Sequence, residues 1–324
     1  MTSTISTTTT SRAVIDGFGG PELFRDDERP LSGPAAGQVQ VRVGAVSVNP
    51  VDLTTRAGKN IPGDAAQFPM VVGWDGAGTV EQVGDGVSGW QVGDRVAAMT
   101  FQPIDQNGTY TQLINLAADL LAPLPDGLAL EQAATLPLAG LTASQIVQWV
   151  DLPAGASLLV DGPVGAVGRL VVQLAARRGI RVVAVAKPAD RDHALELGAA
   201  EVVDRGDFTA AVRQLHPGGV DAAIDLVGGA TAHATLASVR DGGAYATVVP
   251  PYVDPTGPFD PRRGIRHEVL IVHPDTPELT NLLATLRRGE LTSPVERTYP
   301  LAQAGEAHRR QQQGGLRGKL VLLP

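Results

Sequence analysis

The N-terminal third of the chain alternates short apolar runs with turns rich in glycine. Apolar runs of strand length stand at 39–43, 44–48, 71–72, 78–83 and 95–99. Strands this short, interrupted so often by glycine, favour a strongly bent, barrel-like sheet over βαβ units. The preceding residues 1–11 are polar and lack a long apolar segment, so we expect a frayed tail there and no secretory signal.

The pattern changes after residue 130, where helical periodicity and strands begin to alternate. Helices are predicted at 131–136, 142–150, 191–197, 208–215 and 230–239, and strands at 202–203, 222–226 and 244–249. This alternation is typical of an α/β protein with a doubly wound parallel sheet. Later elements are a proline-rich loop at 250–261, a strand at 269–272, helices at 277–288 and 301–311, and a last strand that returns to the first domain.

Residues 157–187 form the centre of this second region and are predicted to fold as strand, glycine turn, helix and strand. Gly162, Gly165 and Gly168 lie between the first strand and the helix. A turn at this place brings backbone N–H groups and the positive helix end to a pyrophosphate. The usual G-x-G-x-x-G motif would have glycine at Pro163, so an ordinary tight turn is the alternative. The flanking strand, helix and strand favour a dinucleotide site.

Composition narrows the class of protein. The 324 residues carry a net charge of −8 and no cysteine. An acidic surface argues against nucleic acid or anionic membranes as the main partner. The lack of cysteine excludes disulfides, thiolate metal sites and a cysteine nucleophile, and the six histidines show no paired metal-site spacing. No apolar run approaches the roughly 20 residues that span a bilayer, so we expect a soluble, cytoplasmic protein with a small-molecule substrate.

Eight segments in this order carry a family resemblance. They are VSVNPVDLTTRAG (46–58), FPMVVGWDGAGTVEQVGDGVSGWQVGDRV (68–96), GTYTQ (108–112), AATLPLAGLTA (133–143), VDGPVGAVGRLVVQLA (160–175), LELGAAEVVD (195–204), DLVGG (225–229) and RGKLVL (317–322). Together they resemble the zinc-independent quinone-oxidoreductase branch of the medium-chain dehydrogenase/reductase superfamily.

The resemblance implies a domain plan. It implies a GroES-like catalytic domain at 12–122 and 275–324, which agrees with the barrel-like sheet, and a Rossmann domain at 123–274 that binds NADPH. The cofactor of such proteins lies in the cleft between the domains. The resemblance also implies a homodimer formed by edge strands of the Rossmann sheets.

The residues at the zinc-ligand positions indicate that no catalytic zinc is bound. Zinc-dependent relatives have cysteine at the position of Asn49 and histidine at that of Trp74, and of the expected set only Asp75 could be a ligand here. Without a Lewis acid, simple alcohol dehydrogenation becomes improbable. Reduction of an activated acceptor, a quinone or an α,β-unsaturated carbonyl, is favoured.

The end of the second Rossmann strand bears on the choice of coenzyme. NAD enzymes usually carry an acid there for the ribose 2′-hydroxyl, whereas residues 184–188 contain Lys187 and no acid. Arg205 stands where relatives often carry a tyrosine near the adenosine phosphate. We therefore expect NADPH, with Lys187 and Arg205 bound to its 2′-phosphate, and we interpret Arg191 as a solvated helix residue.

The resemblance carries further cofactor positions onto this chain. They are Thr142, Gly162, Pro163, Gly165, Ala166, Val167, Val227, Val249 and Lys319.

Asn49 is the candidate donor to the acceptor oxygen, where negative charge develops during hydride transfer. The alternative is that Asn49 caps the turn before Pro50. Asp52 is interpreted as structural, bonding backbone around the turn. Trp74, Lys59 and Asn60 are placed at the substrate pocket, and Trp74 either walls it or fills space.

The proton donor is less well defined. Two tyrosines that many relatives use are replaced by Thr54 and Asn60. Thr54, Lys59, water or Tyr252, in the loop after the strand at 244–249, are the remaining candidates. Three functions therefore stay open: a quinone or enone reductase, a biosynthetic tailoring reductase on a natural-product scaffold, and a catalytically silent NADPH-binding sensor or structural protein.

Overall fold

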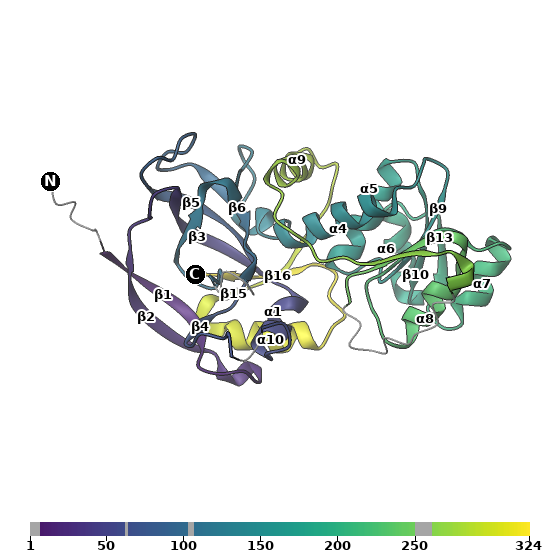
Figure 1. Cartoon of the computed structure of the whole chain (residues 1–324), viewed down its shortest axis with the longest axis horizontal. Coiled ribbons are helices and arrows are strands. Elements are labelled where there is room, and N and C mark those ends of the chain that lie inside the picture. The colour runs from purple at the N-terminus through teal and green to yellow at the C-terminus, as the bar shows by residue number, and fades with distance from the viewer. Residues whose placement is uncertain (1–6, 62–63, 103–106, 250–260) are drawn as a thin grey trace. The chain divides into compact units, whose positions relative to one another are not determined.

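The computed structural model describes residues 7–61, 64–102, 107–249 and 261–324. The chain divides into two compact units (Figure 1): unit 1 comprises residues 1–138 and 273–324, and unit 2 comprises residues 139–272. The division lies at 138/139 and 272/273, and boundaries at 122/123 and 274/275 were expected. Segment 123–138 stays with unit 1, where helix α3 (Leu130–Ala133) packs against strands β3 and β5.

Unit 1 is rich in strands, as the glycine-punctuated runs predicted, and these strands form two sheets. Seven strands form the larger sheet: β3 (Gln38–Val48), β5 (Asp75–Val83), β6 (Arg95–Met99), β7 (Leu113–Ala117), β8 (Leu121–Pro123), β15 (Val295–Pro300) and β16 (Lys319–Leu323). Strand β3 pairs with β5, β7 and β16. Gly78 of β5 allows β3 and β5 to lie close together, because a Cβ at this position would lie 2.2 Å from the carbonyl oxygen of Arg42 on β3.

The smaller sheet corrects one expectation. It consists of β1 (Thr7–Ile15), β2 (Arg25–Ser32) and β4 (Met70–Val71). Residues 7–11 therefore belong to a strand, paired with β2, and not to a frayed tail. Their threonines and serine favour a strand even though the segment is polar, since β-branched residues fit a pleated surface; residues 1–6 lie outside the described part of the chain.

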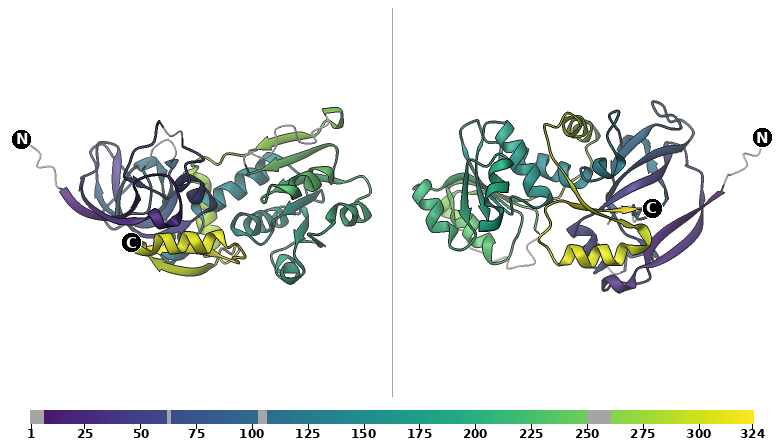
Figure 2. Two further views of the ribbon diagram at one scale, coloured as in Figure 1. Left: turned by 90° about the horizontal axis from the view of Figure 1, so that it is seen from below. Right: turned by 180° about the vertical axis from the view of Figure 1, so that it is seen from behind.

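The C-terminal segment returns to unit 1, as predicted. Helix α9 (Thr276–Arg287) precedes β15, and helix α10 (Ala304–Gln312) lies beside helix α1 (Pro50–Arg56). Figure 2 shows α10, in yellow, among the N-terminal elements of this unit. Strand β16 then pairs antiparallel with the end of β3. This pairing is what places residue 319 next to residue 49.

Unit 2 contains the predicted doubly wound parallel sheet, in the order β11-β10-β9-β12-β13-β14. Its strands are β9 (Ser157–Asp161), β10 (Arg181–Ala186), β11 (Glu201–Asp204), β12 (Val220–Asp225), β13 (Val239–Thr247) and β14 (Arg266–Val269). Its helices are α4 (Pro137–Val150), α5 (Ala166–Arg177), α6 (Arg191–Glu196), α7 (Phe208–Leu215) and α8 (Ala230–Ala237).

One predicted strand of unit 2 is misplaced along the sequence. The apolar run 269–272 was expected to form it, but β14 covers Arg266–Val269. Strand β14 is at the edge of the sheet and mostly exposed, so its polar residues give no apolar signal. The neighbouring Ile271 is exposed instead of buried.

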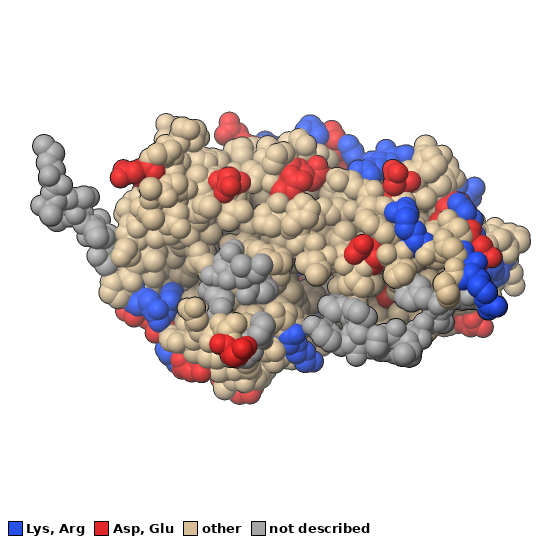
Figure 3. Space-filling model, in the orientation of Figure 1, with Lys and Arg blue, Asp and Glu red and all other residues tan. Residues whose placement is uncertain are grey.

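Charged side chains of both signs lie on the surface of the protein. On the face shown in Figure 3, basic and acidic side chains are interspersed, with no continuous basic area over the described residues. None of the described helices combines the length and the apolar character that crossing a bilayer requires.

Candidate functional site

The glycine turn of unit 2 has the geometry of a phosphate cradle. Gly162 adopts φ +86°, which disfavours a side chain. Gly165 is the N-cap of α5, and the nearest atom to a Cβ placed there would be 3.6 Å away. At Gly168 a Cβ would lie 1.9 Å from the carbonyl oxygen of Gly162, so glycine alone allows this helix to pack so closely on the turn. The three positions match the roles that a dinucleotide turn requires.

Three of the predicted cofactor positions lie in this turn or in the first turn of α5. Ala166 and Val167 are the first two residues of α5, whose N–H groups lack acceptors within the helix. Pro163 occupies the turn itself. The helix end therefore offers both hydrogen-bond donors and the positive end of its dipole.

Asp225 shapes the loop that follows β12. Its Oδ1 accepts hydrogen bonds from the N–H groups of Val227 at 2.9 Å and Gly228 at 2.8 Å, and its Oδ2 accepts one from the Tyr245 hydroxyl at 3.0 Å. Burial and this carboxylate raise the pKa of Tyr245. Val227 is exposed, its side chain faces Gly162, and Val249 packs beside Gly228. Val227 thus lies next to the glycine turn, and Val249 lies beside the loop after β12.

The predicted partners of the 2′-phosphate differ in their present contacts. Lys187 is exposed and directly follows β10. Its carbonyl oxygen accepts a hydrogen bond from the N–H of Asp190 at 2.9 Å, and its ammonium makes no hydrogen bond or ion pair with the described residues. Arg205 forms an ion pair with Asp161, Nη2 to Oδ1, at 3.2 Å. Arg191 donates to the carbonyl oxygen of Val202 at 2.9 Å, so it ties α6 to β11 in addition to being solvated. Thr142 is buried on α4.

Asn49 of unit 1 is buried, and each end of its amide already has partners. It is the N-cap of α1, as the structural alternative predicted. Its Nδ2 donates to Asp75 Oδ1 at 2.8 Å and to Ser47 Oγ at 3.2 Å, while its Oδ1 accepts a hydrogen bond from Lys319. Its backbone N–H donates to Asp52 Oδ2 at 2.7 Å, which confirms the structural role expected of Asp52.

Two carboxylates and one ammonium are buried together around this amide. Burial raises the pKa of Asp75, and Lys319 counteracts the shift. Burial and the charge of Asp75 raise the pKa of Asp52 to about 7. Burial lowers the pKa of Lys319, and both carboxylates counteract that shift. Each charge therefore depends on the others, as expected where water is excluded.

A directed chain of hydrogen bonds runs from Arg56 through His308 and Tyr110 and ends at Asp52. Arg56 can only donate, so its 3.1 Å contact makes His308 Nδ1 an acceptor. Burial and Arg56 lower the pKa of His308 to about 3, so the ring is neutral and its proton is on Nε2. Nε2 then donates to the Tyr110 hydroxyl at 3.0 Å, which donates to Asp52 Oδ2 at 3.2 Å. This order gives Tyr110 a structural role inside unit 1.

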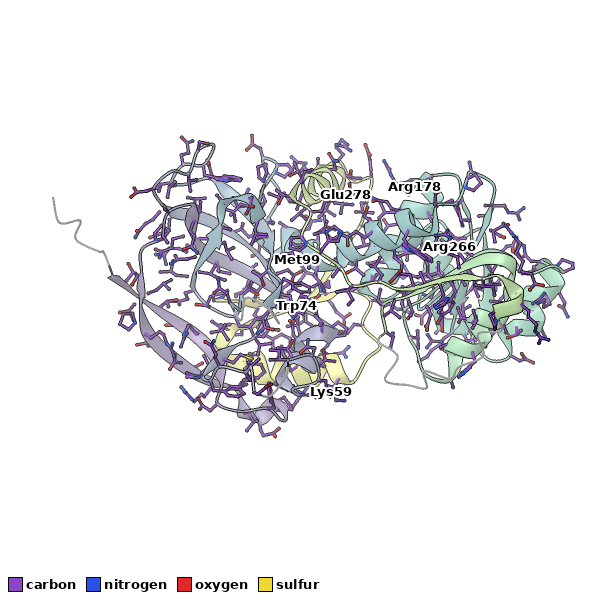
Figure 4. All side chains as sticks on the ribbon, in the orientation of Figure 1. Lys59, Trp74, Met99, Arg178, Arg266 and Glu278 are labelled. Atoms are coloured by element: carbon purple, nitrogen blue, oxygen red, sulfur yellow. The ribbon has the colours of Figure 1, made fainter. Side chains whose placement is uncertain are left out.

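The residues predicted for the substrate pocket and proton transfer are only partly brought together. Trp74 and Asn60 both donate to the hydroxyl of Thr55, at 3.3 Å and 2.9 Å. Trp74 is buried and packs edge-on against Phe101, which favours its space-filling role. In Figure 4 it lies inside unit 1, while Lys59 lies at the periphery.

Of the two remaining candidates for proton donation, Thr54 and Tyr252, the structure describes only Thr54. Thr54 is exposed, and its hydroxyl donates to the carbonyl oxygen of Val51 at 2.8 Å. Tyr252 lies outside the described residues. The sequence analysis did not identify three residues that belong to the hydrogen-bonded groups described above: Ser47, Asp161 and His308. Of these, only Asp161 could have been found from the sequence, because it directly precedes the first glycine of the turn, Gly162.

The residues at the zinc-ligand positions do not fit a zinc ion. Asn49 and Trp74 supply an amide and an indole, and neither is a usual zinc ligand. Asp75 uses Oδ1 for Ser47 and Asn49 and Oδ2 for the N–H group of Leu138. No group of three potential ligand side chains occurs in the described parts of the chain.

Comparison with known proteins gives a consistent result. The profile of the alcohol dehydrogenase GroES-like domain matches residues 35–126, and that of the zinc-binding dehydrogenase family matches residues 197–322. A 2-haloacrylate reductase of a Burkholderia species is 31% identical over 335 residues, covering 96% of this chain and 98% of its own length. A quinone oxidoreductase of Pseudomonas aeruginosa is 30% identical, covering 95% and 97%.

Solved structures extend this similarity to the fold. A mycobacterial protein solved in complex with NADPH has a TM-score of 0.83 and 30% identity, covering 97% of this chain and 100% of its own. The quinone oxidoreductase of Coxiella burnetii has a TM-score of 0.85 and 27% identity, covering 98% and 100%. The glycine turn, the two-unit fold and these relatives together show that the chain belongs to the quinone-oxidoreductase branch of the medium-chain dehydrogenase/reductase superfamily.

Proposed function

We propose that this oxidoreductase transfers a hydride from NADPH to a quinone or an α,β-unsaturated carbonyl compound, without zinc. The observation that carries the proposal is the packing of Gly168 on Gly162, because this close approach of helix and turn is one that dinucleotide-binding turns require. A relative of 30% identity was solved with NADPH. Lys187, whose ammonium has no protein partner among the described residues, adds a cation at the end of β10.

Bound NADPH would supply the hydride, and this chain's residues would bind and orient it. The N-terminus of α5 would hold the diphosphate, and Lys187 and Arg205 the 2′-phosphate. The exposed Val227 would contact the coenzyme beside the glycine turn.

The acceptor side is proposed to depend on Asn49. Both hydrogens of its amide have protein partners, and the contacts to Ser47, 3.2 Å to Oγ and 3.4 Å to the carbonyl oxygen, are weaker than the 2.8 Å bond to Asp75. An acceptor oxygen would take over that hydrogen, while Asp75 and Lys319 hold the amide in place. Charge that develops on the oxygen would be stabilised by a donor already oriented.

A conjugated acceptor is supported by two further points. The name of the Burkholderia relative denotes reduction of an alkene activated by a carboxylate, and that of the Pseudomonas relative denotes reduction of a quinone. The amide and indole at the zinc-ligand positions offer no Lewis acid for alcohol oxidation.

A homodimer is proposed as well, since β14 ends the sheet of unit 2 with an exposed edge. Light scattering of the purified protein would test it, and a monomeric mass at micromolar concentration would contradict it.

The reaction is tested by following NADPH oxidation at 340 nm with a panel of quinones, enones, 2-haloacrylates and enoyl thioesters. Asn49→Asp is the test variant, because it keeps the size of the side chain but removes the donated hydrogens. We expect turnover with at least one acceptor and loss of kcat in the variant, with coenzyme affinity retained. Tight NADPH binding without turnover of any acceptor would support a silent binding protein or a more specialised tailoring enzyme instead.

A further inference from the structure

Asp161 is a fully buried carboxylate at the end of β9, directly before the glycine turn. Its Oδ1 accepts a hydrogen bond from Arg205 Nη2 at 3.2 Å. Its Oδ2 is buried and has no hydrogen-bond partner. A buried carboxylate oxygen without a donor is costly to the fold. The carboxylate is therefore short of one donor.

Arg205 connects this carboxylate to the end of the second strand of the dinucleotide fold. Its backbone N–H donates to the carbonyl oxygen of Ala186 at 3.0 Å, while its side chain reaches Asp161. Asp161 is in register with Val185, the residue before Ala186. Many dinucleotide-binding sheets carry at the end of this second strand an acid that accepts the 2′-hydroxyl of the adenosine ribose. Ala186 cannot do so, but Asp161 presents a carboxylate from the adjacent strand.

The neighbouring carboxylate is not available for the same purpose. Asp225 is opposite Asp161 on β12, but its two oxygens accept hydrogen bonds from Val227, Gly228 and Tyr245. Of these two acids at the carboxyl ends of β9 and β12, Asp161 alone has an oxygen without a donor. An incoming hydroxyl would therefore be bound by Asp161.

We propose that Asp161 accepts a hydrogen bond from a hydroxyl of the adenosine ribose, so that the chain binds NADH as well as NADPH. The inference rests on the proposed function, because it takes a nicotinamide dinucleotide as the ligand. Arg205 and Lys187 attract a 2′-phosphate, whereas the charge of Asp161 repels it and offsets part of the charge of Arg205. Asp161 thus lowers the preference for NADPH that the two cations create.

The test is the ratio of two dissociation constants, that of NADH divided by that of NADPH, measured by fluorescence titration without an acceptor. In Asp161→Asn we expect the ratio to rise at least about tenfold, because NADH loses a hydrogen bond to a charged group and the phosphate loses a repulsion. In Arg205→Ala we expect it to fall. An unchanged or lower ratio in Asp161→Asn overturns the inference.

Two further variants keep the test decisive. Asp161→Asn combined with Arg205→Ala leaves no unpaired charge, so it guards against loss of folding. Compared with Arg205→Ala alone, it should still bind NADH more weakly; equal NADH affinity would mean that Asp161 acts only through Arg205 and would overturn the inference. Arg240→Ala is the matched control, because it removes another partly exposed ion pair of this sheet, 2.8 Å from Asp221, and should leave the ratio unchanged.

The outcomes also separate this inference from the proposed function. If the wild-type protein binds neither dinucleotide, both this inference and the proposed function are wrong. If it binds NADPH and the ratio does not respond to Asp161→Asn, the proposed function stands and only the role of Asp161 is wrong.

Discussion

The amino group of Lys319 donates a hydrogen bond to the amide oxygen of Asn49, across 270 residues of sequence. Both side chains are buried, and Asp75 holds the other end of the same amide. Lys319 was expected to contact the cofactor, and that role stays a prediction. What the structure shows is an ammonium that fixes the orientation of the candidate substrate-binding amide from inside unit 1.

Replacing Lys319 should destabilise unit 1. Lys319→Met leaves Asp75 and Asp52 buried without their cation, and removal of one partner from a buried charge cluster costs about 3 kcal/mol or more. We expect a lower urea midpoint for Lys319→Met. Adding Asp75→Asn should recover part of the loss, because it removes one of the uncompensated charges. A double variant as unstable as the sum of the two single variants would contradict this coupling.

Asp52 should make the fold less stable as the pH rises. Its pKa is raised in the folded protein from the ordinary 3.8 to about 7, so the folded state holds a proton that the unfolded state has released between these values. The stabilisation is complete below about pH 4 and is lost as the pH rises to about 7. The free energy of unfolding of wild type minus that of Asp52→Asn should therefore decrease over this range. A flat difference would show that Asp52 titrates normally.

His308, unlike Asp52, should make the fold more stable as the pH rises. Its pKa is lowered from 6.5 to about 3 in the folded state, so between these values the unfolded state binds the extra proton. Stability contributed by the neutral ring is present above about pH 6.5 and is lost as the pH falls toward 3. In His308→Gln, which has no titrating group, acid unfolding should shift to lower pH. Circular dichroism across a pH series measures it, and an unshifted midpoint would rule out a role for this ring.

Local sequence patterns predicted unit 2 well. Helix α7 was predicted at its observed limits, and the glycines of the turn were identified from their spacing. Their function depends on backbone within a few residues, such as the contact between Gly168 and Gly162. Strand β14 was missed because an exposed edge strand needs no apolar residues.

The clusters of the candidate site could not be predicted in the same way. Asn49 and Lys319 meet only because β16 pairs with β3, and no local pattern encodes that register. The pairing of Arg205 with Asp161 likewise requires the order of strands in the sheet. Family resemblance supplied the positions, but the partners of each side chain required the tertiary structure.

Gly168 and Gly165 should respond differently to alanine. Gly168→Ala forces a Cβ to within 1.9 Å of the Gly162 carbonyl oxygen, so the turn or the helix must move. We expect NADPH affinity to fall by at least about tenfold and the melting temperature to drop by several degrees. Gly165→Ala, whose Cβ would meet nothing within 3.5 Å, is the matched control for folding and should keep the melting temperature of wild type. Equal stability of the two variants would contradict the close-packing argument.

Removal of metal ions should leave the reaction unchanged. The carboxylate of Asp75 is occupied by donors from Ser47, Asn49 and Leu138, and the adjacent Trp74 cannot bind zinc. Prolonged dialysis against a chelator should therefore change neither the rate of NADPH oxidation with the best acceptor nor the melting temperature. Elemental analysis of the active protein should give well under one zinc per chain, with a zinc-dependent alcohol dehydrogenase treated in parallel as the positive control. Loss of activity on dialysis, restored by added zinc, would overturn the metal-free proposal.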